Sequence, residues 1–350
     1  MTGMLTAARR AVLLAGLVAL AACASGTGGS GPGPAPSSGA GAAGPAKAAY
    51  PVTVSSCGTP VTFTAEPRRA VSNDINATED MLALGLAPRM AGDFGVSGDA
   101  ADGEAPVPAP YLDAFHQVKA VSPDYFTLET LIGLHPDFLL AGWNYGLSAG
   151  TRLTPDGLAK FGIKTLALSE SCAHVPPGRT SVSIDDTYQD LASLGAVFNV
   201  RAKASSLIAH MKAQVAKVQQ KVAGLPPVPV FLYDSGEAAP FTAPGLAMPD
   251  ALIQLAGGRN VFGSLKQSWT SVSWEAVAAR KPQCIIINDY GTPTWQQKLR
   301  FLRASPAARN LPAVRRGCIL HLAYDELTPG PRNAEAVAAI ARWLHPQALR

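Results

Sequence analysis

The chain has 350 residues, of which 47% are hydrophobic and 15% are charged, which is the composition of a folded protein long enough for two domains. Its 29 lysines and arginines nearly balance its 25 aspartates and glutamates, so the net charge of +4 indicates no nucleic-acid partner. A single apolar run, at the N-terminus, approaches the roughly 20 residues that span a bilayer. A multi-span channel or permease is therefore excluded.

Residues 1–22 have the pattern of a signal peptide. Arg9 and Arg10 form its positive region, an apolar stretch covers residues 11–20, and small residues precede Cys23. The tetrapeptide Leu-Ala-Ala-Cys that ends at Cys23 resembles the lipobox of bacterial lipoproteins, in which the cysteine receives a diacylglyceryl group. We therefore expect an extracytoplasmic protein that is lipid-anchored to the cell membrane. The alternative is an ordinary secretory signal with a chance cysteine.

Residues 23–48, which begin with the lipidated cysteine, are almost wholly alanine, glycine, serine, proline and threonine. Such a composition cannot bury a hydrophobic core and is typical of a flexible tether. A lipid anchor followed by a tether indicates a folded body that works beside a membrane.

From residue 50 onward, short β-rich runs alternate with helical segments, the pattern of an α/β fold with largely parallel sheets. Strands are predicted at residues 52–54, 61–63, 69–72, 138–141, 164–168, 230–233, 284–287 and 318–322. Helices are predicted at residues 77–84, 128–134, 185–195, 200–222, 250–256, 274–279 and 333–344.

The longest predicted helix separates two α/β halves. Its apolar residues are spaced by three and four, and it ends at Gly224, before two prolines. We expect an N-terminal lobe over residues 49–198, an interlobe helix over residues 199–224 and a C-terminal lobe over residues 225–350.

The two halves share a local sequence pattern. Thr127-Leu128-Glu129 is followed, after six residues, by Pro136 and an apolar strand, and Ser273-Trp274-Glu275 is followed at the same spacing by Pro282 and another apolar strand. Two lobes of the same architecture are the simplest explanation.

Four cysteines remain once Cys23 is lipidated, an even number in an exported and oxidising setting. Two disulfides are expected, and three pairings are possible. We favour Cys57 with Cys172 and Cys284 with Cys318, because each bridge then stays inside one half. A zinc site is the weaker alternative, since the sequence has no Cys-x-x-Cys motif.

Several segments together resemble the substrate-binding lipoproteins of ABC importers for iron–siderophore complexes, haem and cobalamin. Their order and spacing carry the resemblance, which extends from about Tyr50 to His345. The segments are residues 69–79, 82–86, 134–143, 256–262 and 272–275. The resemblance implies two Rossmann-like lobes joined by one rigid helix, here residues 200–222, with the ligand in the cleft between them and with little hinge motion. It also implies a monomeric receptor that binds without catalysis.

In this family, a glutamate on the outer face of each lobe docks onto arginines of the permease subunits. Glu129 and Glu275 match that pattern, one in each half and at equivalent places of the repeat. Each is also a carboxylate in the first turn of a predicted helix, where the helix dipole stabilises it without any partner.

In open α/β sheets, ligands lie beyond the carboxyl ends of the strands, so the residues that follow each strand are candidates. Aromatic faces suit a large planar or catechol-bearing ligand, and polar side chains can bond its periphery. Each candidate could instead pack in the core or cap a turn, and Arg332 could bind either an anionic ligand group or a backbone carbonyl. The candidates are Asn73, Asp74, Asn76, Trp143, Tyr145, Asp234, Phe241, Trp269, Tyr290, Tyr324 and Arg332.

The sequence does not separate the three ligand classes. An iron–siderophore complex is preferred because it is the commonest ligand of such proteins, with cobalamin and haem as alternatives. No protein-bound metal or cofactor is expected, although His116 or a cleft tyrosine could ligate haem iron. Two other functions stay open: a sensor that uses the same cleft, and an esterase in which Ser148 lies in a Gly-x-Ser-x-Gly motif.

Overall fold

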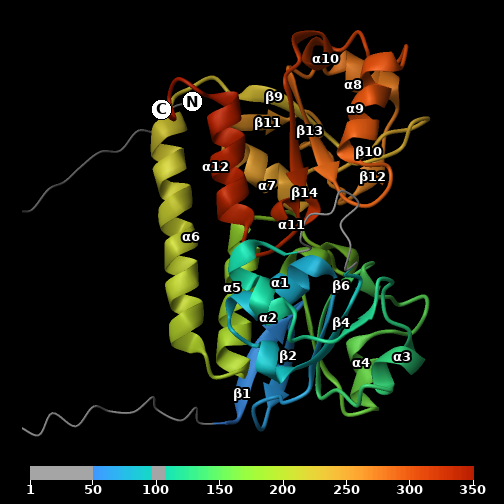
Figure 1. Cartoon of the computed structure of the whole chain (residues 1–350), viewed down its shortest axis with the longest axis vertical. Coiled ribbons are helices and arrows are strands. Elements are labelled where there is room, and N and C mark those ends of the chain that lie inside the picture. The colour runs from blue at the N-terminus through green and yellow to red at the C-terminus, as the bar shows by residue number, and fades with distance from the viewer. Residues whose placement is uncertain (1–49, 97–106) are drawn as a thin grey trace, which may run out of the picture. The chain divides into compact units, whose positions relative to one another are not determined.

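A computed structural model describes residues 50–96 and 107–350 of the chain. The predicted signal peptide, Cys23 and the tether lie outside the described residues. In the described part, two α/β lobes, each built on a parallel sheet, are joined by one long helix, α6 (Arg201–Val222), which runs along both of them (Figure 1). The expected fold is confirmed. None of the described helices is both long enough and apolar enough to span a membrane.

The N-terminal lobe contains a six-stranded sheet in the order β5-β4-β3-β6-β7, with β8 paired to β6, and all these pairings are parallel. An antiparallel hairpin, β1–β2, precedes it. Its strands are β1 (Val52–Ser56), β2 (Thr59–Phe63), β3 (Ala70–Asn73), β4 (Met90–Phe94), β5 (Ala120–Ser122), β6 (Phe138–Trp143), β7 (Gly146–Leu147) and β8 (Lys164–Ala167). Its helices are α1 (Ile75–Ala83), η1 (Ala87–Arg89), α2 (Ala109–Phe115), α3 (Leu128–Ile132), α4 (Pro155–Ala159), η2 (Ser169–His174) and α5 (Ile184–Val197).

The C-terminal lobe contains a four-stranded parallel sheet in the order β11-β9-β13-β14 and a small antiparallel pair, β10–β12. Its strands are β9 (Val228–Tyr233), β10 (Phe241–Thr242), β11 (Gly258–Asn260), β12 (Thr270–Ser271), β13 (Cys284–Asp289) and β14 (Ile319–Ala323). Its helices are α7 (Met248–Leu255), α8 (Trp274–Ala279), α9 (Trp295–Ala304), α10 (Pro312–Arg316), α11 (Tyr324–Leu327) and α12 (Asn333–Leu344).

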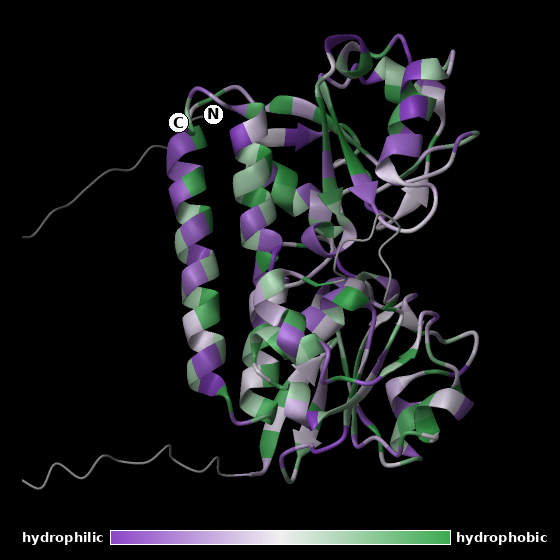
Figure 2. Cartoon of the chain, in the orientation of Figure 1, coloured by the Kyte–Doolittle hydropathy of each residue, from purple (hydrophilic) through white to green (hydrophobic). Residues whose placement is uncertain are grey.

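The central strands are formed by short apolar runs that are buried on both faces, as parallel sheets require. In β13, Ile285, Ile286 and Ile287 are fully buried, and the strand ends in the polar pair Asn288 and Asp289. The change from hydrophobic to hydrophilic along such a strand is visible in Figure 2. The strand therefore passes from the core to a polar edge of the sheet within six residues.

Helix α6 is amphipathic and holds the lobes together through one buried stripe. Ala204, Met211, Val215, Val218 and Val222 are buried, whereas much of the rest of the helix is hydrophilic (Figure 2). The stripe packs against α5 of the N-terminal lobe and α12 of the C-terminal lobe. One hydrophobic cluster therefore passes from Phe198 through α6 to Leu232 without a break between the lobes.

Both disulfides have the favoured pairing, Cys57–Cys172 and Cys284–Cys318. The first joins the turn of the β1–β2 hairpin to η2, and the second joins the start of β13 to the residue before β14. Each bridge stays inside one lobe, as expected.

The repeat predicted from the two Glu-and-Pro segments is also present in the backbone. Thr127 and Ser273 cap α3 and α8 through their hydroxyl groups. The residues before the two prolines, His135 and Lys281, both have φ of 48°, a left-handed conformation uncommon outside glycine. The two helix-to-strand turns thus have the same local geometry.

Sequence patterns missed several short or polar elements. Strand β4 contains Gly92 and Asp93, which interrupt its apolar run, and α9 is rich in charged and amide side chains. Strands β5 and β11 have only three residues each, too few to show the alternation of apolar and polar residues that identifies a strand.

We expect Met211→Ala to reduce the free energy of unfolding by about 2–5 kcal/mol, because Met211 is 1% exposed in the core that links both lobes. Chemical denaturation monitored by circular dichroism measures the change. Gln219→Ala, an exposed position on the same helix, is the control. A loss for Met211→Ala no larger than the control's would show that this stripe does not hold the lobes together.

Candidate functional site

A cavity of about 1110 Å³ lies between the lobes, at the carboxyl ends of strands from both sheets. Its N-terminal wall contains Asp74 after β3, Tyr125 after β5, Tyr145 after β6 and Glu170 after β8. Parallel strands all point the same way, so the segments that follow them meet at one edge of the sheet. This edge is where the sequence placed the ligand site.

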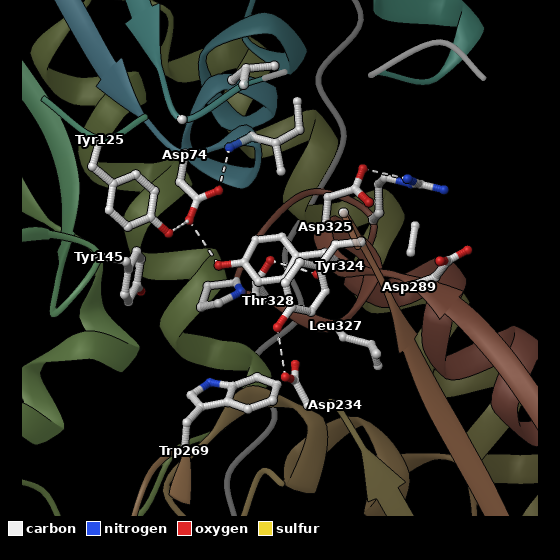
Figure 3. Close-up of a pocket in the computed structure, with 18 of the residues that line it drawn as sticks. Asp74, Tyr125, Tyr145, Asp234, Trp269, Asp289, Tyr324, Asp325, Leu327 and Thr328 are labelled. Atoms are coloured by element: carbon white, nitrogen blue, oxygen red, sulfur yellow. Dashed lines mark hydrogen bonds and ion pairs between the residues drawn. The ribbon is translucent and has the colours of Figure 1, made fainter. Parts of the chain in front are cut away.

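Asp74 is a buried carboxylate with hydrogen-bond donors from both lobes (Figure 3). Its Oδ2 accepts from the hydroxyls of Tyr125 at 2.8 Å and Tyr324 at 2.9 Å, and its Oδ1 accepts from the backbone N–H of Ile75. Burial raises the pKa of Asp74, and the two tyrosine hydroxyls oppose that rise. Its φ of 84° is unusual for a residue other than glycine, and such strain is often found at functional sites.

The C-terminal wall has a comparable arrangement around Asp234, which follows β9. Its Oδ1 accepts from the hydroxyls of Tyr290 at 2.7 Å and Ser235 at 2.8 Å, and its Oδ2 accepts from the amide of Asn288 at 2.7 Å. Tyr290 is 43% exposed, and partial burial raises its pKa, with further rises from the charge of Asp234 and the hydrogen bond to it. Each lobe thus presents one aspartate held by tyrosine.

Aromatic rings form much of the remaining surface. Phe241 and Trp269 stack with ring centroids 6.0 Å apart, and Tyr290 lies 5.4 Å from Tyr324. All four line the cavity. These rings offer flat apolar faces to a large ligand, and the polar groups beside them can fix its orientation.

Glu170 lies in η2, where Cys172 anchors the turn to the hairpin through its disulfide. Its Oε1 accepts from the backbone N–H of Met248, the first residue of α7 in the other lobe, at 3.1 Å. Tyr145 Oη lies 3.5 Å from its Oε2. Burial, partly opposed by the Met248 amide, raises the pKa of Glu170 to about 7.

Other hydrogen bonds also join the lobes beside the cavity. The amide of Asn76 donates to the carbonyl of Pro329 at 2.8 Å, and the hydroxyl of Thr187 donates to Asn333 Oδ1 at 2.9 Å. Together with Tyr324–Asp74 and Met248–Glu170, these contacts hold the cavity in a defined shape.

Most of the binding residues expected from the sequence line the cavity, and three do not. The residues that line it are Asp74, Tyr145, Asp234, Phe241, Trp269, Tyr290, Tyr324 and Arg332. Asn73, Asn76 and Trp143 are not among the lining residues.

The three exceptions have structural contacts instead. Asn73 is fully buried, donating to the carbonyl of Tyr145 and accepting from the backbone N–H of Phe126. Asn76 is used in the lobe contact, and Trp143 packs against the core of the N-terminal lobe. Asn73, the last residue of β3, and its neighbour Asp74 point in opposite directions, so only Asp74 faces the cavity.

Arg332 lines the cavity but is already paired. Its Nη1 lies 2.5 Å from Asp325 Oδ2, and its Nη2 lies 3.1 Å from Glu326 Oε1. Burial lowers the pKa of Arg332, but nearby carboxylates, Asp325 foremost, raise it by more, which keeps the guanidinium charged. The sequence could not show this pair, because the acidic residues lie on a separate short helix, α11.

Sequence reasoning missed Tyr125, Glu170, His174 and Asp325, all of which line the cavity. Glu170 lies just after the predicted strand at residues 164–168, so the rule used for the other strands would have found it. Tyr125 follows a strand of three residues that no apolar run reveals.

Catalysis at Ser148 and iron ligation by His116 have no support from the positions of these residues, whereas four tyrosines do line the cavity. Ser148 pairs with Leu153 in an antiparallel bridge, and the next helix begins only at Pro155, so the strand–turn–helix geometry of a nucleophile elbow is missing at this serine. His116 is exposed at the end of α2 and does not line the cavity. Within residues 50–96 and 107–350, no cluster of three or more histidine, cysteine or acidic residues is arranged to hold a metal ion.

Glu129 and Glu275 are fully exposed in the first turns of α3 and α8. In each case the glutamate's own backbone N–H and the hydroxyl of the N-cap residue lower the pKa of the carboxyl. Both groups are therefore ionised and accessible near neutral pH.

Comparison with known proteins agrees with this geometry. The profile of a family described as "Periplasmic binding protein" matches residues 71–325. A cobalamin-binding protein of Halobacterium salinarum is 25% identical over 310 residues, covering 85% of this chain and 75% of that protein. A vitamin B12-binding protein of Photorhabdus laumondii is 29% identical over 224 residues, covering 64% of this chain and 72% of that protein.

Solved structures show the same fold. A periplasmic binding protein from Veillonella parvula superposes with a TM-score of 0.72 at 29% identity, covering 84% of this chain and 97% of that one. A protein of an ABC-type Fe3+-hydroxamate transport system from Saccharomonospora viridis superposes with a TM-score of 0.73 at 22% identity, covering 85% and 100% of the two chains.

Glu170→Gln is expected to change how stability depends on pH. A carboxyl whose pKa is raised from its usual 4.5 to about 7 stabilises the folded state at low pH, and this contribution is lost as the pH rises through 7. Glutamine keeps the carbonyl oxygen that accepts from Met248 and cannot ionise. Between pH 5 and 8 the variant should therefore gain up to about 3 kcal/mol relative to wild type.

Urea unfolding at pH 5, 6, 7 and 8 measures this difference. Asp156→Asn, which removes an exposed carboxylate on α4, is the matched control. If Glu170→Gln differed from wild type by the same amount at every pH, Glu170 would not titrate in this range.

Proposed function

Because the chain belongs to the periplasmic binding protein family, we propose that it captures a corrinoid such as cobalamin outside the cell and delivers it to the permease of an ABC importer. Proteins of this kind bind solutes of the siderophore, haem and cobalamin group for import. They are not enzymes, and neither is this chain. The cargo and the permease are the parts of this function that we propose.

The observation that carries the proposal is the cavity itself. It occupies about 1110 Å³ between the lobes, above the usual range of roughly 300–1,000 Å³ for ligand pockets, and it combines stacked aromatic rings with a few polar groups. A corrinoid is a large ring with many side-chain amides, and it needs both kinds of surface.

The choice of a corrinoid is supported by the relatives, since those from Halobacterium salinarum and Photorhabdus laumondii are named for binding cobalamin and vitamin B12. An iron–siderophore complex, the ligand preferred from the sequence, is the second candidate. Tyr125, Tyr290 and Trp269 offer faces and hydroxyls that a ferric hydroxamate complex could contact equally well.

Delivery needs a surface for the permease, and Glu129 and Glu275 are suited to it. They are exposed, ionised and at equivalent places of α3 and α8, so each lobe can present one carboxylate to a basic partner. We include the lipid anchor on Cys23 in the proposal, because an anchor and a tether would keep the protein beside its permease.

Purified protein should bind cyanocobalamin saturably in isothermal titration calorimetry, and Trp269→Ala should weaken that binding by about tenfold or more, since a buried aromatic contact is lost. Trp343→Ala, on α12 and away from the lining residues, is the control and should bind as wild type does. Absence of corrinoid binding, with saturable binding of a ferric hydroxamate instead, would replace the first candidate by the second.

Glu129→Ala combined with Glu275→Ala should reduce import of radiolabelled cyanocobalamin by about tenfold or more without changing its affinity for the protein, because charged interface pairs direct association. Uptake by cells that depend on this protein and calorimetry on the purified variant measure the two effects. Asp156→Ala is the matched surface control. Unchanged import in the double variant would show that these glutamates do not dock.

A further inference from the structure

The ionisable groups that line the cavity are mostly acidic. Among the described lining residues there are five carboxylates, against one guanidinium and one imidazole. The carboxylates are Asp74, Glu170, Asp234, Asp289 and Asp325, and the two basic groups are Arg332 and His174.

Neither basic group is available to a ligand anion. Arg332 is bound by Asp325 and Glu326, so two carboxylates already compensate its positive charge. Burial lowers the pKa of His174, which leaves its imidazole neutral near pH 7. Lys298 lies behind the wall: its Nζ donates to the carbonyl of Asn288 at 2.6 Å and sits 4.4 Å from the ring centroid of Tyr290.

The tyrosines add acceptors rather than donors. A phenol has one O–H proton, and Tyr125 and Tyr324 give theirs to Asp74 while Tyr290 gives its proton to Asp234. What these hydroxyls can still offer a ligand is an oxygen lone pair. Asp74 with its tyrosines and Asp234 with Tyr290 therefore offer a ligand only hydrogen-bond acceptors, and a complementary ligand must supply the donors.

We propose that the cavity selects a chelate without net negative charge, one that presents N–H donors, such as primary amides or an ammonium group, toward Asp74 and Asp234. The inference rests on the proposed function, in that the cavity takes a bulky chelate. It goes further by separating amide-bearing and cationic chelates, which are accepted, from haem with its two carboxylates and from tris-catecholate iron complexes, which are rejected.

Cyanocobalamin and its monocarboxylic acid derivatives provide the matched test, because they differ by one amide hydrolysed to a carboxylate and keep the same size and shape. By calorimetry at pH 7.5, each derivative whose changed group enters the cavity should bind at least about tenfold more weakly, since like charges at an interface repel. If every derivative bound as tightly as cyanocobalamin, or more tightly, the inference would be wrong although the proposed function would stand.

A second pair of probes covers the case in which corrinoids do not bind. A neutral ferric tris-hydroxamate should then bind and a ferric tris-catecholate, which carries three negative charges, should not. A preference for the catecholate would overturn the inference. If none of these chelates bound, both the proposed function and the inference resting on it would fail.

Asp234→Asn separates charge selection from a general loss of the site. In this variant, the ratio of the affinity for cyanocobalamin to the affinity for its monocarboxylic acid derivative should come closer to one, even if both affinities fall. Misfolding would lower both affinities without changing their ratio. Asp156→Asn removes the same charge from the exposed face of α4 and should leave the ratio at its wild-type value. An unchanged ratio in Asp234→Asn would contradict the role of this carboxylate.

Discussion

The burial of one carboxylate, Asp74, between the two lobes is the constraint on which the site depends. A buried carboxylate is costly unless hydrogen-bond donors surround it. Tyr125 and the backbone N–H of Ile75 supply donors from the same lobe, and Tyr324 adds a third from the opposite lobe, so the full set of donors forms only when the lobes are together. The same residue directly follows β3 and is the N-cap of α1, which ties the cavity to the framework of the N-terminal sheet.

The rest of the fold keeps this arrangement in place. A continuous hydrophobic cluster joins α6 to both lobes, and Glu170, Asn76 and Thr187 each form a hydrogen bond across the junction. The disulfide at Cys172 anchors the turn that carries Glu170. These links favour a preformed cavity with limited hinge motion, which lowers the ordering cost when a large rigid ligand binds.

Much of the architecture could be predicted from the sequence because its central elements obey strong local rules. The triple-isoleucine run of β13 and the spaced apolar residues of α6 allow few alternatives, and the cysteine pairing follows once two halves are recognised. Strands such as β4 and β5 were missed because tertiary contacts, rather than their own sequence, make them extended.

The sequence predicts which residues lie near the site, because they follow strands, but not whether their side chains point into the cavity. Asp74 and Asp234 were found because they follow strands, yet Asn73 and Trp143, which are equally close to strand ends, point into the lobe. The pairing of Arg332 with Asp325 depends on where α11 places its first turn. Such contacts between chain segments decide whether a charged side chain is free for a ligand, and they cannot be predicted from the local sequence pattern.

Amide hydrogen exchange of the protein with and without cyanocobalamin tests the central claim most directly, because it reports on both walls of the cavity at once. We predict slower exchange in the ligand's presence at segments of both lobes, namely residues 74–75 and 170–174 on one side and residues 289–292 and 324–329 on the other. Slower exchange on one lobe alone, or only away from these segments, would contradict a ligand held between the two lobes.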